Sequence, residues 1–405
     1  MRQRRLIKLA APVVLSALVL AACGDKKEET PGGNGGGDNK VVKIGVIAPL
    51  SGDLSALGLG IKNGVDLAIK QANDAKKIPG WTIQLADKDD TATANVGATV
   101  AAALAADEAV AGVVGTLNSS VAEQVAPVLN QSKIVMVSPA NTGVKLTGRD
   151  KLPNQQRVYA NYFRVATTDD VQGPFAAQYL LGTGAKKLAI IHDKKTYGQG
   201  LATAVDAEFK KGGGTVVLTD TINPGDKLFS AIVTKIVNAK PDAVYYGGEF
   251  PEAAPLSKQL HDAGFKGPLM GGDGIYSQKF IDNGGVVSDL ATSVGAPTDK
   301  LPSAQAFVEA YSKAGYKEPY EAYGAYAYDA ANVIIEALSK ALVGKDKVDA
   351  AVRQAVIDET QKVSISGVTG QVAFDPFGDT TTKVLTVYGV DASKKWVAKK
   401  TDTFK

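Results

Sequence analysis

The chain has 405 residues, of which 45% are hydrophobic and 21% are charged, so a largely disordered protein is excluded and the length suits two or three domains. One cysteine and two histidines exclude an intramolecular disulfide and argue against a Cys-rich or His-rich metal site. The formal charge of +3 is misleading, because residues 1–22 carry four basic and no acidic side chains. From Cys23 onward 41 basic residues face 42 acidic ones, a balance that gives no general attraction to nucleic acid.

The N-terminus has the features of an export signal. Met1–Lys8 is basic, and Leu9–Ala22 is an apolar run of 14 residues, too short for a membrane-spanning helix, which needs about 20. The signal ends at Leu20–Gly24, which resembles a bacterial lipobox and implies cleavage before Cys23 and lipidation of its sulfur. The alternative is an ordinary signal peptide with an incidental cysteine. We expect a lipid anchor at Cys23 that holds the protein on the outer face of the cytoplasmic membrane.

A glycine-rich segment follows the cysteine. Gly24–Asn39 contains six glycines and no large apolar residue, which is typical of a flexible tether. We therefore expect a signal peptide over residues 1–22, a tether over 23–40 and a folded part from about residue 41.

The folded part alternates apolar β-rich runs with helical patterns. The runs lie at residues 41–48, 110–114, 134–137, 187–191, 215–219, 242–246 and 267–271. Near-continuous apolar runs of this kind are typical of parallel strands covered on both faces. Apolar residues recur at helical spacing between them, over 65–72, 229–237 and 334–341. The alternation predicts a doubly wound α/β architecture.

One sheet rarely accommodates a folded part of this length, so we expect two α/β lobes. Polar breaks in composition lie at Thr142–Ala160 and near Ala291–Pro302. We predict that residues 41–165 and 297–380 form lobe 1. Residues 166–296 and 381–405 would form lobe 2.

A glycine motif near residue 60 is similar to the fingerprint of dinucleotide-binding proteins. Gly58, Gly60 and Gly64 follow a strand and open a helix, but the spacing is G-x-G-x-x-x-G and the first glycine comes ten residues after Ala48. A Rossmann turn needs its glycines directly at the strand end. We assign this motif to turn formation and helix packing, and we expect no cofactor.

The sequence gives little support for an enzyme. It contains neither a P-loop nor a G-x-S-x-G motif. His192 ends a predicted strand and is more often a packed residue than a base, and His261 lies in a predicted helix, where we expect a solvated face.

Two hydroxyl-rich turns follow neighbouring strands of the first half. They are Gly115–Ser120 and Ser138–Gly143, and each precedes a predicted helix. Ligands of open α/β sheets bind beyond the carboxyl ends of the strands, and helix N-termini favour anions. The pair of turns predicts a carboxylate site, although simple N-capping by Ser119 or Thr142 is the alternative for each turn alone.

Strand ends of the second half carry the complementary groups. Tyr197 offers an aromatic wall, and Glu249 and Asp273 offer carboxylates for an ammonium group. The alternatives are a Gly-Asp-Gly turn at Asp273 and a solvated helix N-terminus at Glu249. A carboxylate site facing an ammonium site is what an amino-acid receptor needs.

Several landmarks, in their order and spacing, resemble one family. They are Ile44-Gly45, Pro49–Gly52, Ser138–Ala140, Ile191–Lys194, Tyr197-Gly198, Tyr245–Gly248 and Gly370–Asp375. From about Lys43 to Val390 the chain resembles the periplasmic-binding-protein type 1 group, specifically the branched-chain amino-acid binding proteins (Leu/Ile/Val-binding) of ABC importers. The resemblance implies a Venus-flytrap clamshell whose two lobes close on the ligand about a three-strand hinge.

The resemblance also implies roles for individual residues. Ser119 and Thr142 match the residues that hold the ligand carboxylate, in a turn that includes Asn141, and the carbonyl of Ala140 would help to hold the ammonium. Tyr197 matches a pocket tyrosine of the second lobe.

Other positions depart from the family pattern. Asp273 stands where the family usually has a glutamate that pairs with the ammonium, and Leu57 stands where an aromatic often covers the side chain. Asn118 and Ala92 replace a disulfide pair found in some relatives. Glu249 occupies a position that is usually aromatic in leucine binders, so it either points outward, or pairs with another group, or serves a ligand more polar than leucine.

We therefore expect a solute-binding lipoprotein that delivers an amino acid, foremost Leu, Ile or Val, to the permease subunits of an ABC importer. It would hydrolyse nothing and bind neither metal nor nucleic acid. One alternative is a ligand-sensing clamshell for a polar amino acid or a small amide. Another is an exported hydrolase that uses Asp273 and Glu249 as acid and base.

Overall fold

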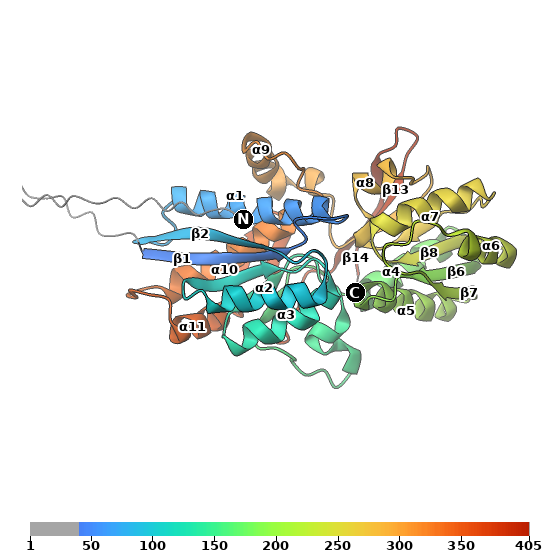
Figure 1. The fold of residues 1–405 in the computed structure, drawn as a ribbon. Helices are drawn as coiled ribbons and strands as arrows, with labels where there is room; N and C mark the ends of the chain where they lie inside the picture. The colour runs from blue at the N-terminus through green and yellow to red at the C-terminus, as the bar shows by residue number, and fades with distance from the viewer. Residues whose placement is uncertain (1–39, 405) are drawn as a thin grey trace, which may run out of the picture. The chain divides into compact units, whose positions relative to one another are not determined.

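The computed structural model describes residues 40–404, so the predicted signal peptide, the tether and Cys23 lie outside the described residues. The first of two large sheets is entirely parallel (Figure 1). Its strands, in spatial order, are β2 (Trp81–Asp89), β1 (Lys40–Ala48), β3 (Val110–Gly115), β4 (Val135–Ser138) and β5 (Tyr162–Arg164).

The second sheet has seven strands and mixed direction. In spatial order they are β14 (Trp396–Thr403), β13 (Val384–Val390), β10 (Leu290–Ser293), β9 (Leu269–Gly271), β8 (Ala243–Gly247), β6 (Lys187–His192) and β7 (Thr215–Thr221). The strands β6 to β10 are parallel, whereas β13 is antiparallel to β10 and to β14. The parallel strands β6 to β10 agree with the predicted parallel sheet, and β13 and β14 extend it as an antiparallel hairpin, because the five residues between them suffice only for a hairpin connection.

Helices and a small hairpin complete the fold. The longer helices are α1 (Ser55–Asp74), α2 (Ala94–Ala106), α3 (Ser119–Gln131), α4 (Asp169–Gly182), α5 (Thr196–Lys211), α6 (Ser230–Ala239), α7 (Phe250–Asp262), α9 (Gln305–Lys313), α10 (Gly324–Ala341) and α11 (Ala350–Thr360). Shorter elements are α8 (Gln278–Asp282), η1 (Val144–Thr147), η2 (Arg149–Lys151), η3 (Asp273–Ile275), η4 (Thr298–Lys300), η5 (Pro302–Ala304) and the hairpin β11 (Ser364–Gly367) with β12 (Gly370–Ala373). Among residues 40–404, every helix is too short or too polar to span a bilayer.

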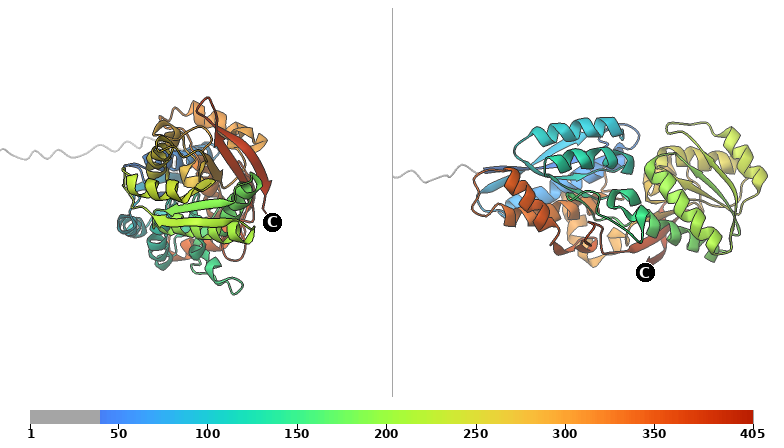
Figure 2. Two further views of the ribbon diagram at one scale, coloured as in Figure 1. Left: turned by 90° about the vertical axis from the view of Figure 1, so that its right-hand side faces the viewer. Right: turned by 90° about the horizontal axis from the view of Figure 1, so that it is seen from below.

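Helices cover both faces of the first sheet and of the parallel part of the second (Figure 2). In β1, Ile44 and Val46 pack in one core with Val65 of α1, while Ile47 packs in another with Val121 of α3. Strands point successive side chains to opposite faces, so a strand buried on both sides must be apolar along most of its length. This explains why each predicted apolar run contains a strand.

The chain passes between the two sheets at three places. It leaves β5 at Arg164 and enters α4, returns after β10 toward α9, and crosses again between β12 and β13. Helix α10 packs against α1 and the first sheet. The predicted lobe boundaries stay predictions, but these crossings are the segments that a hinge would use.

The glycine motif in α1 serves helix packing, as the sequence indicated. A Cβ at Gly64 would lie 2.2 Å from the carbonyl oxygen of Gly324 in α10, and one at Gly60 would lie 2.8 Å from the carbonyl oxygen of Tyr320. We expect Gly64→Ala to lower the free energy of unfolding by about 2 kcal/mol, because α1 and α10 must separate. Urea unfolding measures this. Gly182→Ala, in α4 with nothing within 4 Å, is the matched control and should be neutral or stabilising; equal loss in both variants would contradict the packing role.

Candidate functional site

A small cavity lies among loops that follow strands of both sheets. Its lining residues are Leu57, Leu117, Asn118, Ser119, Ala140, Tyr197, Glu249, Asp273, Gly274 and Tyr323. Six of the eight predicted ligand-binding residues are among them, and Asn141 and Thr142 are not. The cavity occupies the position where open α/β sheets bind ligands, beyond the carboxyl ends of their strands.

The first sheet contributes a hydroxyl at a helix N-terminus. Ser119 is the first residue of α3, and its Oγ accepts a hydrogen bond from the backbone N–H of Gly143 at 3.2 Å. The capping position belongs to Asn118, whose side chain makes no capping bond, so N-capping by Ser119 is wrong. The Ser119 hydroxyl can still donate its own proton, and the helix N-terminus adds partial positive charge. These groups suit a carboxylate.

Asn141 and Thr142 lie behind this wall. The Asn141 amide donates to the carbonyl oxygens of Thr116 and Leu117 at 3.0 and 2.9 Å, and its Oδ1 accepts from the Tyr162 hydroxyl at 3.2 Å. Asn141 therefore fastens the loop after β4 to the loop after β3. Thr142 is buried, and its Oγ1 has no hydrogen-bond partner within residues 40–404. Its predicted contact with the ligand carboxylate stays a prediction, and it does not cap a helix.

Asp273 is the anionic end of the cavity. It begins η3, with one residue between it and the end of β9, and is 1% exposed. Its Oδ1 accepts from Tyr197 Oη at 2.8 Å and from Gln172 Nε2 at 3.0 Å, and its Oδ2 accepts from Tyr323 Oη at 2.8 Å. Burial raises the pKa of Asp273, and these hydrogen bonds oppose that effect.

All three partners of Asp273 are neutral. Within the described residues no Lys, Arg or His nitrogen lies within 4.0 Å of its carboxylate. A buried carboxylate without a cation is costly. The arrangement is therefore complementary to a positively charged group that enters the cavity.

Glu249 lines the cavity and is paired. It is the residue before α7 and is 4% exposed, so the alternative of a solvated helix N-terminus is wrong. Its Oε2 lies 2.8 Å from Lys195 Nζ, and its Oε1 accepts from Asn118 Nδ2 at 2.7 Å. Burial alone would raise the pKa of Glu249, but the Lys195 ammonium holds it below its ordinary value. Of the three possibilities left open by the sequence, the structure selects pairing with another group.

Asp193 shares the environment of Glu249. Its Oδ2 lies 3.8 Å from Lys195 Nζ, and its side chain is fully buried. Burial and the neighbouring Glu249 raise the pKa of Asp193 to about 8. One lysine thus faces two carboxylates, and with Asp193 protonated and Glu249 ionised the three side chains together are near neutrality.

Three contributors were not found from the sequence. Tyr323 and Asn118 line the cavity, and Gln172 supports Asp273 from α4. Tyr323 precedes a helix and does not follow a strand. A search for polar residues at the carboxyl ends of strands therefore does not find it. Asn118 lies in the turn that the sequence singled out, and its side-chain contact to Glu249 spans 131 residues of sequence.

Neither histidine lines the cavity. His192 ends β6, where its Nδ1 accepts from the backbone N–H of Lys194, as a packed strand-end residue does. His261 is 20% exposed and packs against Phe265, with its Nε2 3.6 Å from Asp289. The expectation of a solvated face for His261 is wrong, because this side of α7 packs toward the loop that carries Asp289.

Two α/β sheets, with a cavity lined by the strand-end loops of both, define the class of two-lobed binding proteins. A model of the family described as "Periplasmic binding protein" matches residues 41–395. The chain belongs to this family.

Curated relatives and solved structures agree with that assignment. Leu/Ile/Val-binding protein homolog 3 of Brucella melitensis is 35% identical over 87% of this chain and 92% of its own, and Leu/Ile/Val-binding protein BraC3 of Rhizobium johnstonii has the same identity and coverage. The structure is similar to a leucine-binding protein LivK of Thermotoga maritima, with a TM-score of 0.79, 29% identity and coverage of 89% and 98%. It is also similar to LivJ of Streptococcus pneumoniae in complex with isoleucine, with a TM-score of 0.78, 26% identity and coverage of 90% and 100%.

Proposed function

We propose that the protein is the extracytoplasmic solute-binding component of an ABC importer, and that it binds an amino acid, foremost Leu, Ile or Val, and delivers it to the permease. The names of the relatives support the ligand class and the transport role. The observation that carries the proposal is Asp273, a buried carboxylate in the cavity whose hydrogen-bond partners are all neutral. An α-ammonium group would supply the missing positive charge.

The ligand would lie between the two walls of the cavity. Its carboxylate would face Ser119 and the N-terminus of α3, with Thr142 as a further contact, and its ammonium would face Asp273 and the carbonyl of Ala140. Tyr197, Leu57 and Glu249 would surround the remainder. Because residues of both sheets would hold one ligand, its binding favours the closed form over the open one.

The closed form would then be recognised by the permease subunits. We propose that the protein itself catalyses no reaction and that a lipid on Cys23 keeps it at the outer face of the membrane.

A thermal-shift screen of the purified protein against the twenty amino acids and small amides tests the proposal. A ligand at 100 times its Kd adds about 2.7 kcal/mol of stability, which produces a clear rise in Tm. We expect shifts with Leu, Ile and Val, and recovery of the unchanged amino acid by mass spectrometry. Absence of a shift with every amino acid would contradict the proposal, and conversion of the ligand would favour the hydrolase.

A further inference from the structure

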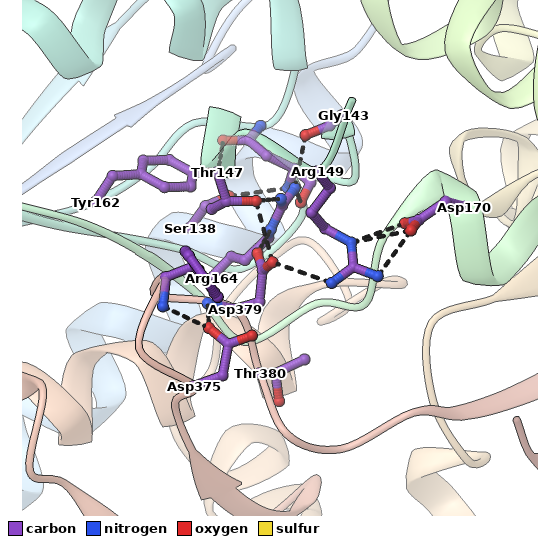
Figure 3. Close-up of polar contacts among 12 residues, drawn as sticks. Ser138, Gly143, Thr147, Arg149, Tyr162, Arg164, Asp170, Asp375, Asp379 and Thr380 are labelled. Atoms are coloured by element: carbon purple, nitrogen blue, oxygen red, sulfur yellow. Dashed lines mark hydrogen bonds and ion pairs between the residues drawn. The ribbon is translucent and has the colours of Figure 1, made fainter. Parts of the chain in front are cut away.

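A fully buried arginine lies behind the first wall of the cavity. Arg164 is the last residue of β5, and its buried guanidinium donates hydrogen bonds to Asp379 and to groups of the loop after β4 (Figure 3). Nε donates to Asp379 Oδ1 at 2.6 Å, and Nη1 donates to the carbonyl oxygens of Asn141 and Gly143 at 3.2 and 2.8 Å. Nη2 donates to the hydroxyl of Thr147. A buried guanidinium is stable only when an opposite charge lies beside it and its N–H groups have hydrogen-bond acceptors.

The two carbonyls that Arg164 holds flank Thr142 in the loop that lines the cavity at Ala140. The backbone N–H of Gly143 in turn donates to Ser119 Oγ at 3.2 Å, so the same short loop orients the hydroxyl that faces the cavity. Arg164 does not line the cavity itself. Its effect on a ligand would therefore pass through the loop.

Asp379 connects this loop to the crossing segments. It lies between β12 and β13, where the chain crosses between the sheets, and Arg164 directly precedes the crossing that leads to α4. Thr147 Oγ1 donates to Asp379 Oδ2 at 3.0 Å, and Arg149 Nη1 lies 3.6 Å from the same oxygen. Asp379 is thus the common partner of three side chains of the first half.

Arg149 extends the network to α4. Its Nε and Nη2 donate to both oxygens of Asp170, at 2.7 to 3.0 Å, in the first turn of that helix (Figure 3). A bidentate pair fixes direction as well as distance. The loop at residues 140–143, two of the three crossing segments (after β5 and between β12 and β13) and the start of α4 are therefore joined by one continuous set of hydrogen bonds and ion pairs.

We propose that Arg164 and Asp379 are positioning residues for ligand binding. Their buried ion pair holds the Ala140–Gly143 loop in its binding conformation. It also links this loop to the segments that cross between the two sheets, which a hinge motion would use. This role deepens the proposed function and rests on it, since it assumes that the loop contacts the ligand. A ligand that pulls on the loop then acts directly on the crossing segments.

The test is the affinity of Asp379→Asn for L-leucine, measured by calorimetry at a temperature where the variant is folded. The variant leaves Arg164 without a counter-charge, and we expect affinity to fall about tenfold although residue 379 does not line the cavity. Asp379→Glu, which keeps the charge, should recover part of the loss. Wild-type affinity in Asp379→Asn would overturn the proposal.

Asp289→Asn is the matched control for lost stability. Asp289 is a buried carboxylate of the second half that accepts from Ser257 Oγ and from the backbone N–H groups of Leu269 and Val286. Its variant should lose stability but keep its affinity for L-leucine. Equal losses of affinity in both variants would reduce the role of Asp379 to general stability and overturn the proposal.

Two further measurements cover the other outcomes. If Asp379→Asn does not fold, Arg149→Gln replaces it, and we expect a loss of about threefold in affinity, whereas no loss would overturn the proposal.

If the wild type binds no amino acid, the proposed function fails, and amide hydrogen exchange of residues 139–148 in the ligand-free protein decides instead. If the amide hydrogens of residues 139–148 exchange faster in Asp379→Asn than in Asp289→Asn, the positioning role is supported. Equal exchange rates in the two variants overturn it.

Discussion

Replacing Asp273 by asparagine is expected to weaken amino-acid binding by about 100-fold or more, while the ligand-free protein stays as stable as the wild type or becomes more stable. The loss of affinity follows because the α-ammonium would enter a buried site without its counter-charge, which costs about 3–5 kcal/mol. Calorimetry with L-leucine measures this loss, and urea unfolding measures the stability. Most substitutions of a buried polar residue lower both quantities together, so the opposite directions are diagnostic.

The gain in stability has its own physical reason. Burial raises the pKa of Asp273 in the folded protein above the ordinary value of 3.8. The ionised form therefore costs stability as pH rises from the unfolded pKa through the folded one, and at neutral pH an asparagine removes that cost. Asparagine also keeps an oxygen that can accept from Tyr197 or Gln172.

Tyr323→Phe is the matched control for Asp273→Asn. It removes one hydrogen bond to Asp273 at 2.8 Å and leaves the charge in place, so we expect a loss of about tenfold in affinity. If Asp273→Asn binds L-leucine as tightly as the wild type, Asp273 does not pair with the ammonium.

Much of the fold could be predicted from local pattern, and the exceptions have a physical cause. The run at residues 41–48 is apolar at nearly every position because both faces of β1 are covered, whereas a strand with one solvated face would alternate apolar and polar residues. β14 is exposed over most of its length and rich in lysine and threonine, so its sequence carries no burial pattern. Its strand conformation depends on pairing with β13, which only the folded chain supplies.

Some residues of the candidate site could also be predicted from local sequence, and others could not. Residues in the turns after strands, such as Ser119 and Asp273, could be placed together because parallel strands end at one edge of a sheet. The state of Glu249 could not be predicted, because its partners Lys195 and Asn118 are 54 and 131 residues away in sequence. The same holds for Tyr323, which reaches the cavity from the start of α10.

The pairing of Glu249 also bears on the ligand. A lone carboxylate beside an aliphatic side chain would be costly, and on that ground the sequence left a polar ligand open. With Lys195 at 2.8 Å and Asn118 at 2.7 Å, the charge of Glu249 is compensated inside the wall. The carboxylate therefore does not by itself exclude Leu, Ile or Val, which the names of the relatives favour.

A second large effect is expected for the pH dependence of stability at Asp169. This residue begins α4 and is 1% exposed, and its carboxylate has no ion-pair partner within residues 40–404; the neighbouring hydroxyl of Thr142 opposes the effect of burial on its pKa only in part. Burial raises its pKa to about 8. Because the native state holds this proton more tightly than the unfolded chain, stability falls as pH rises from about 4 to about 8.

Asp169→Asn should remove that part of the pH dependence. At pH 5 we expect variant and wild type to be similar, and at pH 9 we expect the variant to be more stable by about 4 kcal/mol, as the raised pKa implies. Urea unfolding at pH 5, 7 and 9 measures the difference. Asp358→Asn, at an exposed position of α11, is the control and should follow the wild type at every pH. If Asp169→Asn lost stability with rising pH as steeply as the wild type, Asp169 would not be the source of the pH dependence, and the prediction would be contradicted.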